Sequence, residues 1–280
     1  MAKHRIERWF GLVRSLIIYW RPGRQRGLQE LYRPFVGAGD LAFDVGAHLG
    51  DRTHAFRKLG ARVVALEPQP AVRRWLEFLV GRSRDVSIRS EAVGRAVGTA
   101  RLALSHRTPS MSSLAEDWPG GLSERNPAFR GVSWDDSVTV PVTTLDALIE
   151  QYGLPRFCKI DVEGYEAEVL EGLSHRIPAL SVEFVVGALD VAEACVRRLE
   201  SLGEYEFNAV EGEGRKFMSK RWLGADEMVA WLEGGRGNVS SGDVYARLRG
   251  ETDTTGDGES NAGAGEDGHS DRTGGHSSNG

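Results

Sequence analysis

The chain has 280 residues, of which 40% are hydrophobic and 27% charged, a composition typical of a globular protein with a packed core. Its formal net charge of -5 gives no overall basic field, which argues against nucleic acid as a partner. The two cysteines, Cys158 and Cys195, lie in separate apolar runs, which excludes a disulfide framework and favours a reducing, cytoplasmic setting.

A basic amphipathic helix is predicted over residues 6–20, where large apolar residues recur at helical spacing with arginines between them. Its most apolar run is too short to span a bilayer, so we expect neither a transmembrane helix nor a signal peptide. A second short helix is predicted over residues 28–35. Two roles remain open for residues 1–36, a packed cap on the following domain or peripheral contact with the inner face of a membrane.

From residue 40 to residue 250, short apolar runs alternate with helical patterns, which indicates parallel strands joined by crossover helices. The expected strands of this domain are residues 41–45, 62–67, 86–93, 157–162 and 179–185. The expected helices are residues 51–59, 71–80, 145–152, 166–173 and 191–202. Strands are also predicted at residues 205–210 and 244–248, with a partly helical segment, 221–232, between them.

One long insertion interrupts this alternation. It begins with a predicted antiparallel excursion, residues 100–105, continues as a polar stretch to residue 136, and returns with a strand at 138–142. A connection of that length inside a compact domain is usually a lid or a binding loop. After Gly250 the residues are mostly Gly, Ser, Thr, Asp and Glu, so we interpret 251–280 as a disordered acidic tail.

The first segment that points to chemistry is Asp44-Val45-Gly46-Ala47-His48-Leu49-Gly50, a strand end followed by a glycine turn. Such a turn lets the backbone approach a nucleotide and exposes the amides at a helix N-terminus. The spacing lacks the first glycine of the dinucleotide pattern GxGxxG. Alone, the turn fits either a nucleotide site or a purely structural turn.

A carboxylate, Glu67, ends the next predicted strand, at the position where it would accept hydrogen bonds from ribose hydroxyls. The other interpretation of Glu67 is a helix-capping or solvated acid. Asp44 and Glu67 together indicate a nucleotide-type ligand much more strongly than either residue alone.

A third segment, Lys159-Ile160-Asp161-Val162-Glu163-Gly164, closes the predicted strand 157–162. Alternation with period 2 would place Lys159, Asp161 and Glu163 on one side of the strand's carboxyl end, where open α/β sheets bind ligands. Three ionisable groups there are costly unless they are paired or used in chemistry. A Lys159–Asp161 salt bridge with Glu163 capping the next helix is the structural alternative.

In their order along the chain, these segments resemble the motifs of the FkbM family of methyltransferases. The residues that carry the resemblance are Phe43-Asp44-Val45-Gly46-Ala47, Leu66-Glu67-Pro68-Gln69-Pro70, Glu91-Ala92-Val93-Gly94, Ser112-Ser113, Thr144-Leu145-Asp146 and Lys159-Ile160-Asp161-Val162-Glu163-Gly164-Tyr165-Glu166. The resemblance covers about residues 40–210 and implies the α/β class I methyltransferase fold, a Rossmann-like, mostly parallel doubly wound sheet with an antiparallel last hairpin. His48 stands where the family usually has asparagine.

The resemblance implies S-adenosylmethionine as the cofactor and O-methylation of a sugar, glycan or natural product. The methionine part of the cofactor would then contact the strand end and glycine turn, namely Asp44, Gly46, Ala47, His48 and Gly50. Glu67 would hold the ribose, and Glu91 and Ala92 would lie near the adenine. Ser112 and Ser113 would contact the cofactor from the long insertion.

Asp161 is the predicted general base or acceptor-orienting carboxylate, because an alcohol must lose its proton as the methyl group arrives. Lys159 and Glu163 would tune it, and Glu183, in the predicted strand 179–185, is a second candidate. Asp161 and Glu183 could bind a divalent cation, but the sequence does not assign one. We expect a small-molecule or glycan acceptor, and the sequence does not indicate an oligomeric state.

Two other functions use parts of the same sequence. A nucleotide-dependent oxidoreductase would share the order of strands and helices and Glu67, but the missing first glycine and the Lys159–Gly164 segment argue against it. A membrane-surface or partner-binding module would use the basic N-terminal helix on a cofactor fold without turnover. We therefore predict an S-adenosylmethionine-dependent O-methyltransferase.

Overall fold

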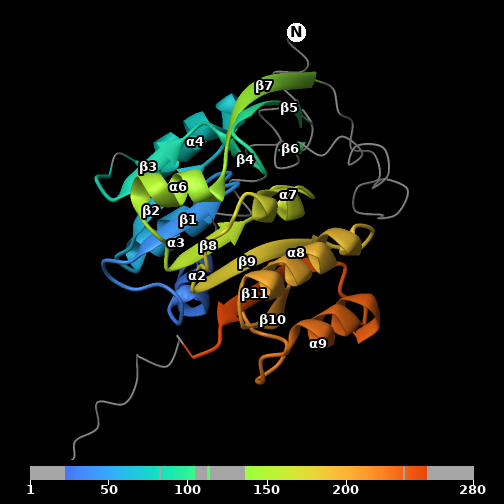
Figure 1. Cartoon of the computed structure of the whole chain (residues 1–280). Helices are drawn as coiled ribbons and strands as arrows, with labels where there is room; N and C mark the ends of the chain where they lie inside the picture. The colour runs from blue at the N-terminus through green and yellow to red at the C-terminus, as the bar shows by residue number, and fades with distance from the viewer. Residues whose placement is uncertain (1–22, 82, 105–111, 114–135, 236, 251–280) are drawn as a thin grey trace, which may run out of the picture.

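The computed structural model describes residues 23–81, 83–104, 112–113, 136–235 and 237–250 (Figure 1). The predicted helix at 6–20, most of the long polar insertion and the tail at 251–280 lie outside these residues. The division of the chain at residues 39 and 250 therefore stays a prediction. Among the described helices, none has the length and apolar character needed to cross a membrane.

The main sheet has seven strands in the order β10-β11-β9-β8-β1-β2-β3. Its members are β1 (Leu41–Val45), β2 (Arg62–Leu66), β3 (Val86–Arg89), β8 (Phe157–Ile160), β9 (Ala179–Val185), β10 (Tyr205–Glu211) and β11 (Ser241–Leu248). β11 runs antiparallel to both of its neighbours, β9 and β10. The other four pairs of neighbouring strands, β9–β8, β8–β1, β1–β2 and β2–β3, are parallel. The predicted mostly parallel sheet with an antiparallel last hairpin is confirmed.

Both faces of this sheet are covered by helices, which is why its strands have nearly continuous apolar sequences. The helices are α2 (Arg24–Tyr32), α3 (Asp51–Lys58), α4 (Pro70–Val80), α6 (Leu145–Tyr152), α7 (Glu166–Glu171), α8 (Leu189–Leu202) and α9 (Ala225–Ala230), the last continued by the π-helical turn η2 (Trp231–Gly235). α2 and α3 pack on one face, whereas α6, α7, α8 and α9 pack on the other (Figure 1). Because helices cover both faces of the sheet, a ligand site is expected at the ends of its strands.

α2 belongs to the same core as the sheet, because its Tyr32 lies edge-on to Phe56 and Phe157, with ring centroids 4.7 and 5.4 Å apart. The helix begins at Arg24, earlier than the predicted start at residue 28, and ends at Tyr32. Arg24 carries no apolar signal, yet it is buried because its guanidinium pairs with Asp51 at 2.9 Å. The first turn of α2 was not predicted, because the prediction used the spacing of apolar residues and this turn is held by an ion pair.

A second, four-stranded sheet contains β4 (Ala92–Val93), β5 (Gly98–Leu104), β6 (Ser112–Ser113) and β7 (Asp136–Thr143), in the order β4-β7-β5-β6. The prediction of one strand over residues 86–93 was wrong. The chain leaves the main sheet after Arg89, and β4 pairs with β7 instead. A continuous apolar alternation does not reveal such a change of partner. The antiparallel excursion itself is present as the β5–β7 pair.

The turn after β1 touches the turn after β8 so closely that only glycine fits. Gly46 has a φ of +79°, and a Cβ added to it would lie 1.8 Å from the backbone oxygen of Asp161. Its amide donates to the carbonyl of Leu66 at 3.0 Å, which joins the turn to β2 as well. The ends of β1, β2 and β8 thus form one contiguous backbone unit.

We expect Gly46→Ala to lower the free energy of unfolding by about 3 kcal/mol or more, because it adds a backbone clash to left-handed strain. Gly39→Ala is the matched control: Gly39 has a φ of +85°, but no heavy atom lies within 4 Å of an added Cβ. Gly39→Ala should lower the free energy of unfolding by only about 1–2 kcal/mol, which is the cost of a left-handed conformation for alanine. Equal losses for the two variants in urea unfolding would contradict the close approach.

Candidate functional site

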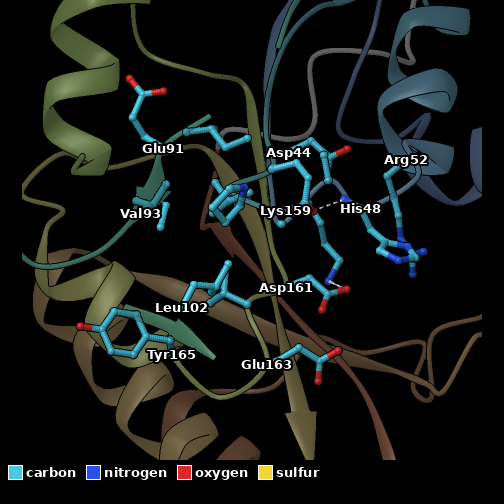
Figure 2. A pocket seen from close by; sticks show the side chains of 18 of the residues that line it. Asp44, His48, Arg52, Glu91, Val93, Leu102, Lys159, Asp161, Glu163 and Tyr165 are labelled. Atoms are coloured by element: carbon cyan, nitrogen blue, oxygen red, sulfur yellow. Dashed lines mark hydrogen bonds and ion pairs between the residues drawn. The ribbon is translucent and has the colours of Figure 1, made fainter. Parts of the chain in front are cut away.

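A pocket opens at the carboxyl ends of β1, β2 and β8 (Figure 2). Its lining comes from the turn after β1, the end of β2, the strands β4 and β5, and the segment after β8. The second sheet therefore lines one side of the pocket through residues such as Leu102 of β5, and Tyr165, just before α7, lines it as well (Figure 2).

Asp44, the last but one residue of β1, is buried and accepts a short hydrogen bond from the hydroxyl of Thr53 in α3. Burial raises the pKa of Asp44 to about 6, although the Thr53 hydrogen bond and the nearby Arg52 oppose the shift. A carboxylate that is costly to ionise in the free protein gains from a cationic ligand. Thr53 was missed from the sequence, because a threonine inside a helix carries no distinctive signal.

Glu67 follows β2 and holds two turns of backbone against the pocket. Its Oε2 accepts from the amide of His48 at 3.0 Å, and its Oε1 accepts from the amide of Gln69 at 2.8 Å. Burial raises the pKa of Glu67 to about 7 in spite of these two hydrogen bonds. Each carboxylate oxygen has further acceptor capacity, so Glu67 can take hydroxyl donors while it keeps the turns in place.

His48 contributes to this arrangement through its backbone rather than its ring. It has a φ of +48°, a left-handed conformation that asparagine adopts more readily than most residues, and its amide is the group bound by Glu67. Burial lowers the pKa of its imidazole to about 4, so the ring is neutral near pH 7. The hydrogen bond to Glu67 does not require an asparagine side chain at this position.

Glu91 lines the opposite side of the pocket from Asp161, with Ala92 beside it (Figure 2). Its carboxylate pairs closely with Arg89, and the Arg89 hydrogen bond holds the pKa of Glu91 below its usual range. Arg89 in turn donates to the hydroxyl of Tyr152 at 2.8 Å, which fixes it to α6. This side of the pocket therefore carries a positioned carboxylate whose ionised form Arg89 stabilises.

Lys159 is fully buried at the end of β8, and its ammonium lies 2.8 Å from Oδ1 of Asp243 and 3.3 Å from Oδ2 of Asp161. Burial would lower the pKa of Lys159, but Asp161 and Asp243 together raise it well above its ordinary value. The ion pair expected between Lys159 and Asp161 is present. Asp243, on β11, was missed, because the predicted strand began only at residue 244.

Glu163 lines the pocket next to Asp161, whereas Glu183 is not among the lining residues but lies close to both. One carboxylate oxygen of each residue lies within 4.8 Å of one from each of the others. Burial raises the pKa of both glutamates well above the usual range, and the charge of Asp161 raises it further. The alternative role of Glu163 as a helix cap is not seen, because the N-cap of α7 is Tyr165 and no side chain caps it. Glu166 instead holds the turn before α7, where its Oε1 accepts from the amides of Val162 and Gly164 at 3.0 and 3.2 Å.

Three predicted cofactor residues are not among those that line the pocket. Gly50 lies at the start of α3, where an added Cβ would lie 2.4 Å from Leu76 of α4, so its constraint here is packing. The backbones of Ser112 and Ser113 form β6, which pairs with the end of β5, but their side chains lie outside the described residues. The cofactor contacts of these three residues stay predictions, as do those of the predicted residues that line the pocket.

Arg52 lines the pocket mouth and was also missed. Its guanidinium lies 3.1 Å from Asp51 and 3.3 Å from Glu213, and Arg24 of α2 contacts the same two acids at 2.9 and 2.7 Å. Burial alone would raise the pKa of Glu213, but the two arginines hold it at about 2. The network fastens α2 and the loop after β10 to the start of α3.

Comparison with known proteins gives consistent matches. The model of the methyltransferase FkbM domain matches residues 44–233. The hexuronic acid methyltransferase AglP of Haloferax volcanii is 30% identical over 180 residues, which are 62% of this chain and 67% of that protein.

Two solved structures illustrate the more distant matches. The TehB-like SAM-dependent methyltransferase of Corynebacterium glutamicum has a TM-score of 0.44 and 10% identity, over 89% of this chain and 99% of that one. The precorrin-6y C5,15-methyltransferase of Geobacter metallireducens has a TM-score of 0.40 and 13% identity, over 80% and 87%.

We expect Lys159→Met to lower the free energy of unfolding by about 3–5 kcal/mol, because it leaves the acids around it without their cation. Arg95→Met is the matched control, since the side chain of Arg95 is 64% exposed and pairs with Glu168 at the surface. That change should have a much smaller effect on the free energy of unfolding, because an ion pair at the surface contributes little. Similar unfolding midpoints in urea for both variants would show that the Lys159 pairs are not structural.

Proposed function

The chain belongs to the FkbM methyltransferase family, and from that membership we propose that it moves a methyl group from S-adenosylmethionine to a hydroxyl oxygen of a sugar. The observation that carries this proposal is that one pocket contains both Glu67, a buried acid bound to backbone amides, and Asp161, an acid open to the pocket. Glu67 is suited to bind the hydroxyls of a nucleoside, and Asp161 is suited to bind the hydroxyl of an acceptor.

The residues present fit this cofactor. S-adenosylmethionine, when bound, supplies an electrophilic methyl group on a positively charged sulfur, and this pocket is lined by Asp44, Glu67, Asp161 and Glu163. Glu67 would accept from the ribose hydroxyls with the lone pairs that His48 and Gln69 leave open. Asp44 would face the methionine part, and Glu91 would lie at the adenine side.

Asp161 is the proposed base, because its side chain is 29% exposed whereas that of Lys159 is 1% exposed. The carboxylate can therefore reach an acceptor hydroxyl, and the ammonium holds it in place from behind. Asp161 would orient that hydroxyl and take its proton as the oxygen gains the methyl group. Glu163, next to it at the rim, would act on the same acceptor.

A sugar is the proposed acceptor because the relative AglP is named as a hexuronic acid methyltransferase. Carboxylates at a pocket rim are also suitable acceptors for the several hydroxyls of a sugar ring. Arg52, at the pocket mouth, would lie on the acceptor side and would suit an acidic sugar.

The affinity for S-adenosylmethionine should rise by up to about tenfold between pH 6 and pH 8. The carboxyl of Glu67 has a pKa of about 7 in the free protein, and its ionised form accepts both ribose hydroxyls. Calorimetry at several pH values measures the rise. Glu67→Gln should bind more weakly and lose most of the pH dependence, so an equal rise in that variant would remove Glu67 from the ribose site.

Calorimetry with NAD on the same protein separates the proposal from an oxidoreductase. We expect no saturable binding of NAD at concentrations that saturate S-adenosylmethionine. Binding of NAD as tight as that of S-adenosylmethionine would refute the proposed function.

Asp161→Asn should reduce methyl transfer to a uronic acid or neutral hexose acceptor by about 10²–10⁴-fold, because it removes the proton acceptor but keeps the size of the side chain. A tritium-labelled methyl group measures the transfer. Cofactor affinity should stay within about twofold, since Glu67 and the turn after β1 are untouched. Near-normal turnover of the variant would assign the proton to another group.

A further inference from the structure

Three carboxylates from separate backbone positions converge at one point beside the pocket. Asp161 follows β8, Glu163 lies in the turn after it, and Glu183 is on β9, which neighbours β8 in the sheet. Their oxygens lie within 4.8 Å of one another. Figure 2 shows the carboxylates of Asp161 and Glu163 at the pocket, with the Lys159 ammonium next to that of Asp161.

The acids at this point outnumber the cations that the described side chains supply. Lys159 is the one described cation that pairs with any of the three acids, and Asp243 shares it. Oε2 of Glu183 is buried and accepts no hydrogen bond from any described residue. Glu183 also lies directly opposite Asp243 in the β9–β11 register, which adds a like charge to its surroundings.

A buried carboxylate oxygen without a donor is costly, so a ligand that supplies positive charge is expected there. The spacing of the oxygens favours an ion. Oxygen ligands about 2.1–2.6 Å from a hard divalent cation lie roughly 3–5 Å from one another, as the three oxygens do here. An all-oxygen donor set suits Mg²⁺ or Mn²⁺ better than softer metals.

We propose that Asp161, Glu163 and Glu183 bind one divalent cation, Mg²⁺ or Mn²⁺, at the acceptor side of the pocket. Oδ2 of Asp161 faces Lys159, so its Oδ1 would bind the ion. Three protein ligands leave coordination positions open toward the pocket, where two oxygens of a sugar acceptor would bind. The part of this inference that concerns the acceptor rests on the proposed function.

Mn²⁺ binding to the full chain, measured by electron paramagnetic resonance of the free ion, tests the site without any need for activity. We expect one ion per chain in the wild type and an affinity at least about tenfold lower in Glu183→Gln. Glu171→Gln, at an exposed position of α7, is the matched control and should bind like the wild type. No saturable binding up to about 10 mM Mn²⁺, or equal affinity in Glu183→Gln, would overturn the site.

The melting temperature gives a second test, because Glu183→Gln should differ from the wild type in one direction in chelator and in the other direction with Mn²⁺. In chelator, Glu183→Gln should melt at a higher temperature than the wild type, because it removes repulsion among the acids. Added Mn²⁺ should raise the melting temperature of the wild type and of Glu171→Gln, but not that of Glu183→Gln. A melting temperature of Glu183→Gln that Mn²⁺ raises as much as that of the wild type would count against the site.

Separate assays distinguish this inference from the proposed function. Methyl transfer at an unchanged rate in chelator would overturn the ion's role with the acceptor and leave the transferase proposal intact. Stoichiometric Mn²⁺ binding in a protein that binds no S-adenosylmethionine would support the ion site and refute the transferase proposal.

Discussion

The pairing of one fully buried ammonium with two carboxylates is the interaction on which the geometry of the rim depends. Lys159 ends a parallel strand, Asp161 continues it into the pocket, and Asp243 approaches from the antiparallel β11. A buried lysine keeps its proton only while such partners compensate for lost hydration. The position of Asp161 at the pocket is therefore tied to the last strand of the sheet, far away along the chain.

Around this pairing, the protein gathers acids in a place where burial makes them costly. Burial raises the pKa values of Asp44, Glu67 and Glu166 to about 6, 7 and 7, and each has hydrogen-bond donors that oppose the shift. Glu166 and Glu67 use their carboxylates to hold backbone turns. No described group donates to Oε2 of Glu183, so not every acid of this cluster has a role in holding the backbone.

The sequence predicted the sheet well because buried parallel strands and amphipathic helices leave periodic apolar signals, and β1, α6 and β9 begin and end where the pattern placed them. It also placed Asp44, Glu67 and Asp161 at strand ends that meet. It failed where a contact depends on a partner distant in the chain. Arg24 begins a helix because of Asp51, Asp243 matters because of Lys159, and β4 leaves the main sheet because β7 offers another partner. Periodicity within one segment cannot report such pairings.

The close contact between Gly46 and the backbone of Asp161 means that two segments far apart in the chain must move together. A shift of the glycine turn would carry the carbonyl of Asp161 with it, so the two sides of the pocket cannot move independently. A chimera that replaced only one of these segments with that of a distant relative would misalign the two sides of the pocket even if every individual side chain were retained. In protein engineering, the two turns would therefore have to be exchanged together.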